Sequence, residues 1–147
     1  MITKKGSFNF KLKNQKVKTM KSLLPRWVGI TAKNWFLKGF RTGGGQTDAS
    51  AGGWEKRKSN NKGKGRSILV KSGALRNSIQ VLRTRFEAIV VGSTGLVYAR
   101  IHNFGLMGKA FGKHSFKMPK REYIGKSTEL EKVIKTKIER ELNLIFK

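Results

Sequence analysis

The chain has 147 residues, of which 37% are hydrophobic, so it suits one domain with a buried core, spanning 1–147, rather than two. Its 33 Lys and Arg against 8 Asp and Glu give a formal net charge of +25, which indicates an anionic partner. The absence of cysteine excludes disulfides, thiol nucleophiles and cysteine-ligated zinc. Residues 88–99, the longest uncharged stretch, are too few to cross a bilayer, so we expect no membrane association.

Two periodic patterns open the chain. Phe8, Phe10 and Leu12 alternate with polar residues, which predicts a strand with one buried face. Apolar residues then recur at spacings of three and four over 14–40, which predicts an amphipathic helix. Pro25 lacks an amide donor and predicts a kink or a break in this helix.

Residues 41–67 predict a long flexible loop, because they combine two runs of glycine with many cations and have Trp54 as the one large apolar anchor. The cations are candidates for contact with DNA or with a protein partner, since neutralised phosphates release counterions. The alternative is a solvated loop, or a run at 56–58 that imitates a nuclear localisation signal. The candidate contact residues are Lys56, Arg57, Lys58, Lys62, Lys64 and Arg66.

The middle of the chain predicts a turn followed by a hairpin. Ser72-Gly73 indicates the turn, and Leu75 returns the chain to the core. Residues 79–83 and 88–92 then have the composition of two antiparallel strands.

A short helix is predicted next, over 97–104, ended by Gly105 in the left-handed conformation. Residues 106–117 predict a second mobile loop because they are rich in glycine and lysine.

A C-terminal helix is the clearest element. Thr128 and Glu131 have the spacing of a capping box, and six apolar residues then fall on one helical stripe. A stripe of this kind more often packs within its own subunit than on a neighbour. The predicted fold class is therefore α+β, a small antiparallel sheet packed with a long N-terminal helix and a C-terminal helix. The stripe consists of Leu130, Val133, Ile134, Ile138, Leu142 and Ile145.

The residues that enzymes need are scarce. Asp48 is the only aspartate, and four of the seven glutamates lie in the C-terminal helix, so paired carboxylates lack candidates. A triad of Asp48, a serine and His102 or His114 lacks a Gly-x-Ser-x-Gly elbow, and no phosphate-binding glycine motif occurs. The two histidines lack neighbouring acidic ligands, and Tyr98 and Phe104 suit a core better than a base-stacking platform. We expect no catalytic site, no metal and no cofactor.

Four ordered blocks carry a family resemblance. Trp54, 68–79, Val91-Gly92-Ser93 with 98–105, and 118–125 together resemble the phage virion morphogenesis family. The chain has Asn103, Lys120, Glu122 and Tyr123 where this family commonly has glutamine, alanine, proline and phenylalanine. The family-motif positions, expected to be structural, are Trp54, Gly73, Leu75, Ser78, Tyr98, His102, Gly105, Pro119 and Arg121.

This resemblance implies a tail completion protein, similar to the head–tail joining and neck proteins of tailed bacteriophages. It implies a ring of six identical subunits around the DNA channel, at the head-proximal end of the tail or in the neck, and no catalysis. The expected partners are further copies, tail-tube or connector proteins and, non-specifically, phage DNA. The expected location is the virion, after assembly in the host cytoplasm. Residues 41–66 are expected to face the lumen or an acidic partner.

The alternative is a small basic nucleic-acid-binding protein, associated with ribosomes or with the nucleoid. Such a protein would bind DNA or RNA tightly as a monomer and lose affinity steeply with salt. The sequence has no helix-turn-helix or zinc-finger pattern for reading bases.

Overall fold

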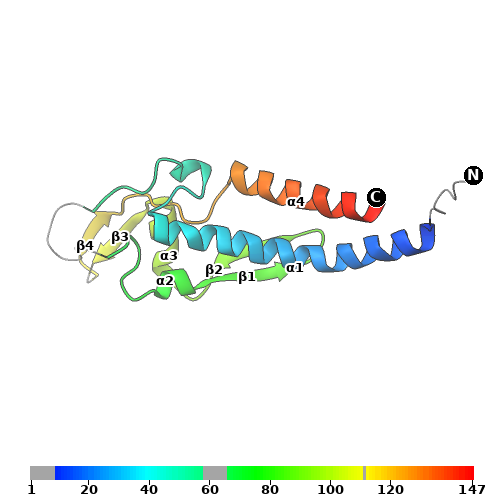
Figure 1. The fold of residues 1–147 in the computed structure, drawn as a ribbon. Helices are drawn as coiled ribbons and strands as arrows, with labels where there is room; N and C mark the ends of the chain where they lie inside the picture. The colour runs from blue at the N-terminus through cyan, green and yellow to red at the C-terminus, as the bar shows by residue number, and fades with distance from the viewer. Residues whose placement is uncertain (1–8, 58–65, 111) are drawn as a thin grey trace, which may run out of the picture.

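The computed structural model describes residues 9–57, 66–110 and 112–147, and within them it confirms the α+β fold (Figure 1). It has two small antiparallel sheets where the sequence predicted one. A long helix, α1, extends along the molecule beside α4, while β3 and β4 lie at the end away from the C-terminus. The elements are α1 (Phe10–Thr42), the 3-10 turn η1 (Asp48–Ser50), α2 (Ala74–Asn77), β1 (Ile79–Thr84), β2 (Ile89–Ser93), α3 (Val97–Phe104), β3 (Met107–Ala110), β4 (His114–Lys117) and α4 (Thr128–Phe146).

The start of α1 corrects the predicted N-terminal strand. Asn9 caps the helix, because its Oδ1 accepts a hydrogen bond from the Leu12 amide at 3.0 Å. Phe10 and Leu12 therefore belong to the first helical turns, and Phe8 lies outside the described residues. The alternating pattern was short, whereas the lysines and the glutamine that follow are good helix formers and extend the helix back to its cap.

The predicted helix over 14–40 is confirmed as part of α1, which continues without a break through Pro25. Proline already has the helical φ, so its cost is a missing hydrogen bond and local crowding, which the rest of a 33-residue helix tolerates. The helix ends where Gly43 adopts a left-handed φ of 79° and donates its amide to the Gly39 carbonyl at 2.9 Å.

The glycine-rich part of the predicted flexible loop is folded. The Trp54 amide donates to the Gly43 carbonyl, and the Trp35 indole donates to the Gln46 carbonyl at 2.7 Å. Gln46 and Trp54 are buried, so flexibility is wrong for residues 43–54. These backbone groups find partners on α1 and within the loop, which the composition alone did not reveal. Residues 58–65, where the basic run continues, lie outside the described residues.

The first hairpin is confirmed and packs against α1. β1 and β2 pair antiparallel, with Ile79 opposite Ser93 and a bulge between Val81 and Arg83. Gly29 of α1 makes this close approach possible, because a Cβ there would lie 2.7 Å from a methyl of Val81.

A second hairpin replaces the mobile loop predicted over 106–117. β3 and β4 pair antiparallel, with Met107 opposite Lys117 and Gly108 opposite Phe116. The Phe116 ring covers Gly108 so closely that a Cβ there would lie 2.6 Å from it. Glycine and lysine have low strand propensity, so cross-strand pairing rather than local preference forms these strands.

The N-terminus of α4 differs from the predicted capping box. Ser127 is the N-cap, and its Oγ accepts from the Leu130 amide at 3.3 Å. Thr128 instead donates its amide and its hydroxyl to the Asp48 carboxylate, at 2.9 and 2.8 Å. These bonds, the backbone one foremost, hold the pKa of Asp48 below its ordinary value. A carboxylate at this helix end also suits the helix dipole, so η1 is attached to α4.

The core consists of two touching clusters. The larger one surrounds Phe40 and Ile79, and the smaller one joins Leu130 of α4 to Ala32 and Phe36 of α1. Leu130 and Ile134 of the α4 stripe therefore pack within their own chain, whereas Val133 is exposed. The larger cluster consists of Phe40, Trp54, Leu75, Ile79, Ala99 and Tyr123.

The predicted α3 and its Gly105 cap are confirmed, with φ 66° and the Gly105 amide donating to the Ile101 carbonyl. We predict that Gly105→Ala lowers the free energy of unfolding by about 2 kcal/mol or more, because a left-handed non-glycine residue costs roughly 1–2 kcal/mol. The new Cβ would also lie 2.9 Å from Lys120 Cβ. Urea denaturation measures the loss.

Gly95→Ala is the matched control. Gly95 has φ 72°, but no described atom lies within 4 Å of a Cβ built there. Its free energy of unfolding should therefore fall only by the cost of a left-handed non-glycine residue, about 1 kcal/mol. Equal losses in the two variants would show that the Gly105–Lys120 approach is unimportant.

Candidate partner-binding site

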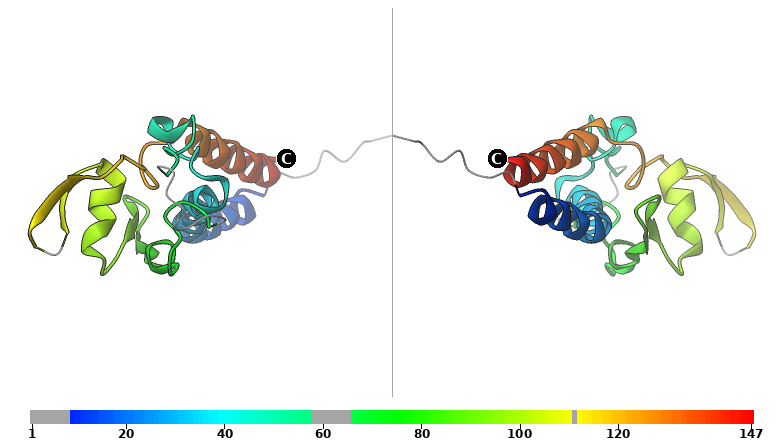
Figure 2. Two further views of the ribbon diagram at one scale, coloured as in Figure 1. Left: turned by 90° about the vertical axis from the view of Figure 1, so that its left-hand side faces the viewer. Right: turned by 90° about the vertical axis from the view of Figure 1, so that its right-hand side faces the viewer.

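Five of the nine family-motif positions line one pocket of about 400 Å³, which we call the motif pocket. They are Gly73 and Leu75 at α2, Tyr98 and His102 on α3, and Arg121 in the segment before α4. Figure 2 shows α3 between the β3–β4 hairpin and α1. The other lining residues are Arg57, Ile68, Leu69, Val70, Lys71, Ser72 and Ala74.

The segment before α2 forms one wall of the motif pocket. Among the described residues, Leu69 is the one non-glycine residue with a positive φ, 60°. Such strain costs about 1–2 kcal/mol and is held by the packing of this segment against the larger core cluster. Gly73, with φ 81°, then turns the chain into α2, so that Leu75 is buried. The predicted Ser72-Gly73 turn is confirmed.

Two arginines connect the pocket to residues 56–66, which we call the basic segment. Arg121 is buried; its Nε donates to the Glu55 carbonyl at 3.1 Å, and its amide donates to the His102 carbonyl at 2.9 Å. Arg57 donates to the carbonyls of Arg66 and Ser67, at 3.1 and 2.9 Å. Burial lowers the pKa of Arg121. The two ends of the basic segment are therefore held together at the pocket.

His102 lines the pocket with its ring edge-on to Tyr98, at a centroid distance of 5.9 Å. Its Nδ1 is buried and has no hydrogen-bond partner among the described residues. Burial foremost, and then the nearby Arg121 charge, lower the pKa of His102, so the imidazole is neutral at pH 7. A neutral imidazole can pack here without the cost of a buried charge.

Trp54 and Asn103 fix the segment that carries Arg121. The Trp54 indole donates to the Glu122 carbonyl at 3.0 Å. Asn103 Oδ1 accepts from the amides of Tyr123 and Ile124, at 2.9 and 3.1 Å, while its Nδ2 donates to the Ile124 carbonyl. Irregular backbone is thereby satisfied by side chains from α3 and from the glycine-rich segment.

The remaining motif positions surround the same region. Ser78 donates to the Leu75 carbonyl at 2.7 Å and pairs with the hydroxyl of Ser93, which joins α2 to β2. Gly105 approaches the backbone of Lys120, and Pro119 precedes it, partly buried. The structural role expected of the motif positions stays a prediction.

The comparison with known families agrees with this geometry. The sequence profile of the phage virion morphogenesis family matches residues 42–143, well over half of the chain. The chain belongs to this family. Searches of curated proteins and of solved structures gave no match. The matched range contains the motif pocket, both hairpins and most of α4, while nearly all of α1 precedes it. The protein therefore acts in the assembly of the phage virion.

The structure describes three of the six basic residues that were predicted to contact DNA or a protein partner. Lys56, Arg57 and Arg66 are exposed. Of these three, Arg57 lines the motif pocket, and its side chain donates to the carbonyls of Arg66 and Ser67. The other three predicted contact residues, Lys58, Lys62 and Lys64, lie outside the described residues.

Sequence reasoning gave no role to two residues that join α3 to the segment carrying Arg121 in this family member. Asn103 and Tyr123 stood out only as departures from the family pattern, yet both are buried, and the Tyr123 hydroxyl donates to the Ala99 carbonyl at 3.1 Å. An asparagine on the inner face of an amphipathic helix was the available signal, because a buried amide requires partners.

The described residues hold no group of three His, Asp or Glu side chains that could bind a metal ion. In the same residues, no helix has a long enough apolar stretch to cross a bilayer.

Removing the Asn103 amide should destabilise the fold strongly. We predict that Asn103→Ala lowers the free energy of unfolding by about 3 kcal/mol, because two amides lose their acceptor and each unsatisfied buried group costs roughly 1–3 kcal/mol. Asn34→Ala, at an exposed position of α1, is the control and should change it by less than about 0.5 kcal/mol. A similar small effect at Asn103 would contradict its assigned role.

Stability should fall on the acid side because of His102. Its folded pKa lies below the ordinary value of 6.5, so as the pH drops through 6.5 the unfolded chain takes up the proton first and is favoured. Thermal midpoints measured between pH 8 and pH 5 should decline below about pH 6.5. His102→Gln should flatten this decline, while His114→Gln, at an exposed position, should retain it.

Proposed function

We propose that this protein completes the tail, or joins tail to head, as a ring of identical subunits through which the DNA passes. The observation that carries the proposal is the convergence of the family-motif residues on one pocket that also fixes both ends of the basic segment. A rigid base of this kind would present the cations at a set place in a larger particle. In this proposal the role of the protein is structural, and it catalyses no reaction.

The charge supports a role beside an anion. Each copy carries a formal charge of +25, so six copies in one ring would repel unless DNA or acidic protein surfaces lie close by. Ring formation is therefore expected to depend on a partner or on salt.

The end of the molecule that carries α3 and β3 has exposed apolar side chains that could form subunit contacts. Val97 of α3 is 91% exposed, and Phe104, Leu106 and Met107 follow at the same end with large exposed fractions. Exposed apolar residues gathered on neighbouring elements are typical of protein interfaces, whereas scattered ones are ordinary. These residues are candidates for the contact between neighbouring copies.

The basic segment can be tested without disturbing the pocket. A phage deleted for this gene should accumulate unjoined heads and tails, and the wild-type protein supplied in trans should restore infectious particles. The variant Lys56→Gln, Lys58→Gln, Lys62→Gln, Lys64→Gln should restore about tenfold fewer particles or less, since each lost cation removes a counterion-releasing contact. Arg57 and Arg66 are left intact because Arg57 bridges the segment.

The control variant carries the same charge change at four exposed lysines outside residues 56–66 and outside the N-terminal half of α1, Lys38→Gln, Lys126→Gln, Lys135→Gln, Lys147→Gln. It should restore particles nearly as well as the wild type. Equal loss in both variants would assign the effect to total charge, and full restoration by the segment variant would remove its role. Joined particles in the deleted phage would overturn the proposed function itself.

A further inference from the structure

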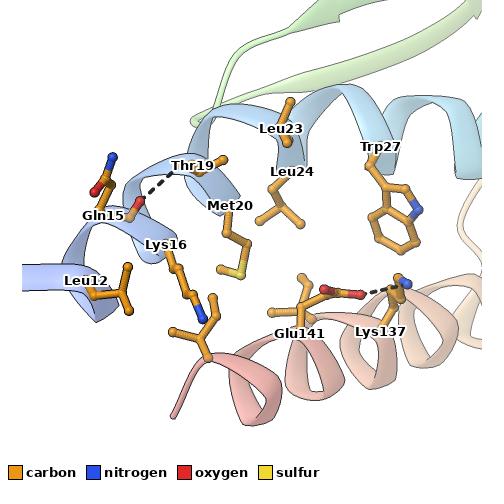
Figure 3. Close-up of a pocket in the computed structure, with 12 residues that line it drawn as sticks. Leu12, Gln15, Lys16, Thr19, Met20, Leu23, Leu24, Trp27, Lys137 and Glu141 are labelled. Atoms are coloured by element: carbon orange, nitrogen blue, oxygen red, sulfur yellow. Dashed lines mark hydrogen bonds and ion pairs between the residues drawn. The ribbon is translucent and has the colours of Figure 1, made fainter. Parts of the chain in front are cut away.

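A second cavity lies far from the motif pocket, between the N-terminal half of α1 and the C-terminal half of α4 (Figure 3). It has a volume of about 640 Å³, and we call it the helix groove. Lys13 donates to the Phe146 carbonyl at one end, and the Lys137 ammonium lies 5.9 Å from the Trp27 ring at the other. The groove is lined by Leu12, Gln15, Lys16, Thr19, Met20, Leu23, Leu24, Trp27, Lys137, Ile138, Glu141 and Ile145.

The groove leaves apolar side chains open to solvent. Leu12 and Leu23 are 48% and 60% exposed, although they belong to the same stripe of α1 as the half-buried Leu24. The β1–β2 hairpin covers another side of α1, at Gly29, and does not line the groove. Two helices with an apolar seam between them, over which no third element of the described residues lies, form a surface suited to an amphipathic helix.

The charges of the two walls differ. α1 carries nine Lys and Arg residues and no Asp or Glu, whereas α4 carries four of each sign. Lys16 lines the groove, and Arg26 is exposed one turn after Leu23 on the same face of α1. On α4, the lining cation Lys137 is already paired with Glu141 at 2.8 Å. The uncompensated positive charge therefore lies along the α1 side.

We propose that the helix groove binds an amphipathic helix of another virion protein, with Asp and Glu residues along the flank that faces α1. DNA has no apolar face to cover the seam, and neither long helix of a second copy has a net negative charge, since α1 has no Asp or Glu and α4 has four charged residues of each sign. The lining of α1 runs from Leu12 to Trp27, which at 1.5 Å per residue is matched by a partner helix of roughly 15 residues. This inference depends on action in virion assembly, but not on a ring or on a place in the tail.

Two synthetic helical peptides test the charge requirement. Both have about 18 residues and the same leucine face, and their flanks carry glutamate in one peptide and lysine in the other. Titration of the full-length protein, followed by calorimetry, should show binding of the glutamate peptide at least about tenfold tighter than that of the lysine peptide. Lys16→Glu should reduce this preference. Equal affinities, or no binding of the glutamate peptide, would overturn the proposal.

Two double variants test the position. Leu12→Gln with Leu23→Gln should weaken binding of the glutamate peptide by about tenfold, because both side chains lie in the groove. Leu82→Gln with Phe86→Gln is the matched control, since these residues are 51% and 58% exposed on the first hairpin, and it should leave binding unchanged. Equal weakening by the two variants would overturn the assignment.

The virion itself supplies the last test. A photo-crosslinking amino acid in place of Leu23 should join, in assembled particles, to a segment of a different virion protein with apolar residues three or four apart and an excess of Asp and Glu, identified by mass spectrometry. The same amino acid in place of Leu82 is the control. A crosslink to another copy of this chain, to a basic segment, or to nothing would contradict the proposal, and particle yield would still report separately on the tail function.

Discussion

The docking of residues 121–124 against α3 is the contact on which the rest of the site depends. This segment has no regular secondary structure, so its buried amides and carbonyls need side-chain partners. Asn103 and Trp54 supply them, and Tyr123 adds a buried ring that packs 5.6 Å from Phe40. Because Trp54 lies in the glycine-rich segment and Asn103 on α3, one short stretch of backbone joins three parts of the chain.

The sequence was a good guide wherever a local pattern decides the structure. The β1–β2 hairpin, α3 with its Gly105 cap and the helical course of α1 and α4 all follow from periodicity and capping residues. The errors arose where contacts between distant residues decide. The β3–β4 strands depend on pairing across the hairpin, and the fold of residues 43–54 depends on Trp35 and Trp54. The cap of α4 moved by one residue because Thr128 bonds Asp48, 80 positions away in the chain.

The candidate site was also predicted only in part, because some of its features follow from sequence motifs and others from contacts in three dimensions. The family blocks identified Gly73, His102 and Arg121, which do meet in the motif pocket. Their resemblance gave no indication that Arg57 would bridge the ends of the basic segment, because that contact is visible only in three dimensions. The helix groove was not predicted from the sequence, for a related reason. A stripe of apolar residues on α4 looks the same in sequence whether its end is covered or open, and only its first turns, at Leu130, are buried.

The basic segment and the helix groove, as proposed, would contact different partners. Surface ion pairs contribute little to stability, and three of the eight acidic side chains already pair with lysines of the same chain, Lys120, Lys132 and Lys137. The remaining positive charge is therefore better matched by other molecules than by this one. α1, about 50 Å long at 1.5 Å per residue, joins the core at Phe40 to the groove at Leu12. A partner held in the groove would thus be kept at a fixed distance from the motif pocket, so that the proposed charge contact at one end and the proposed apolar contact at the other would select different neighbours within one particle.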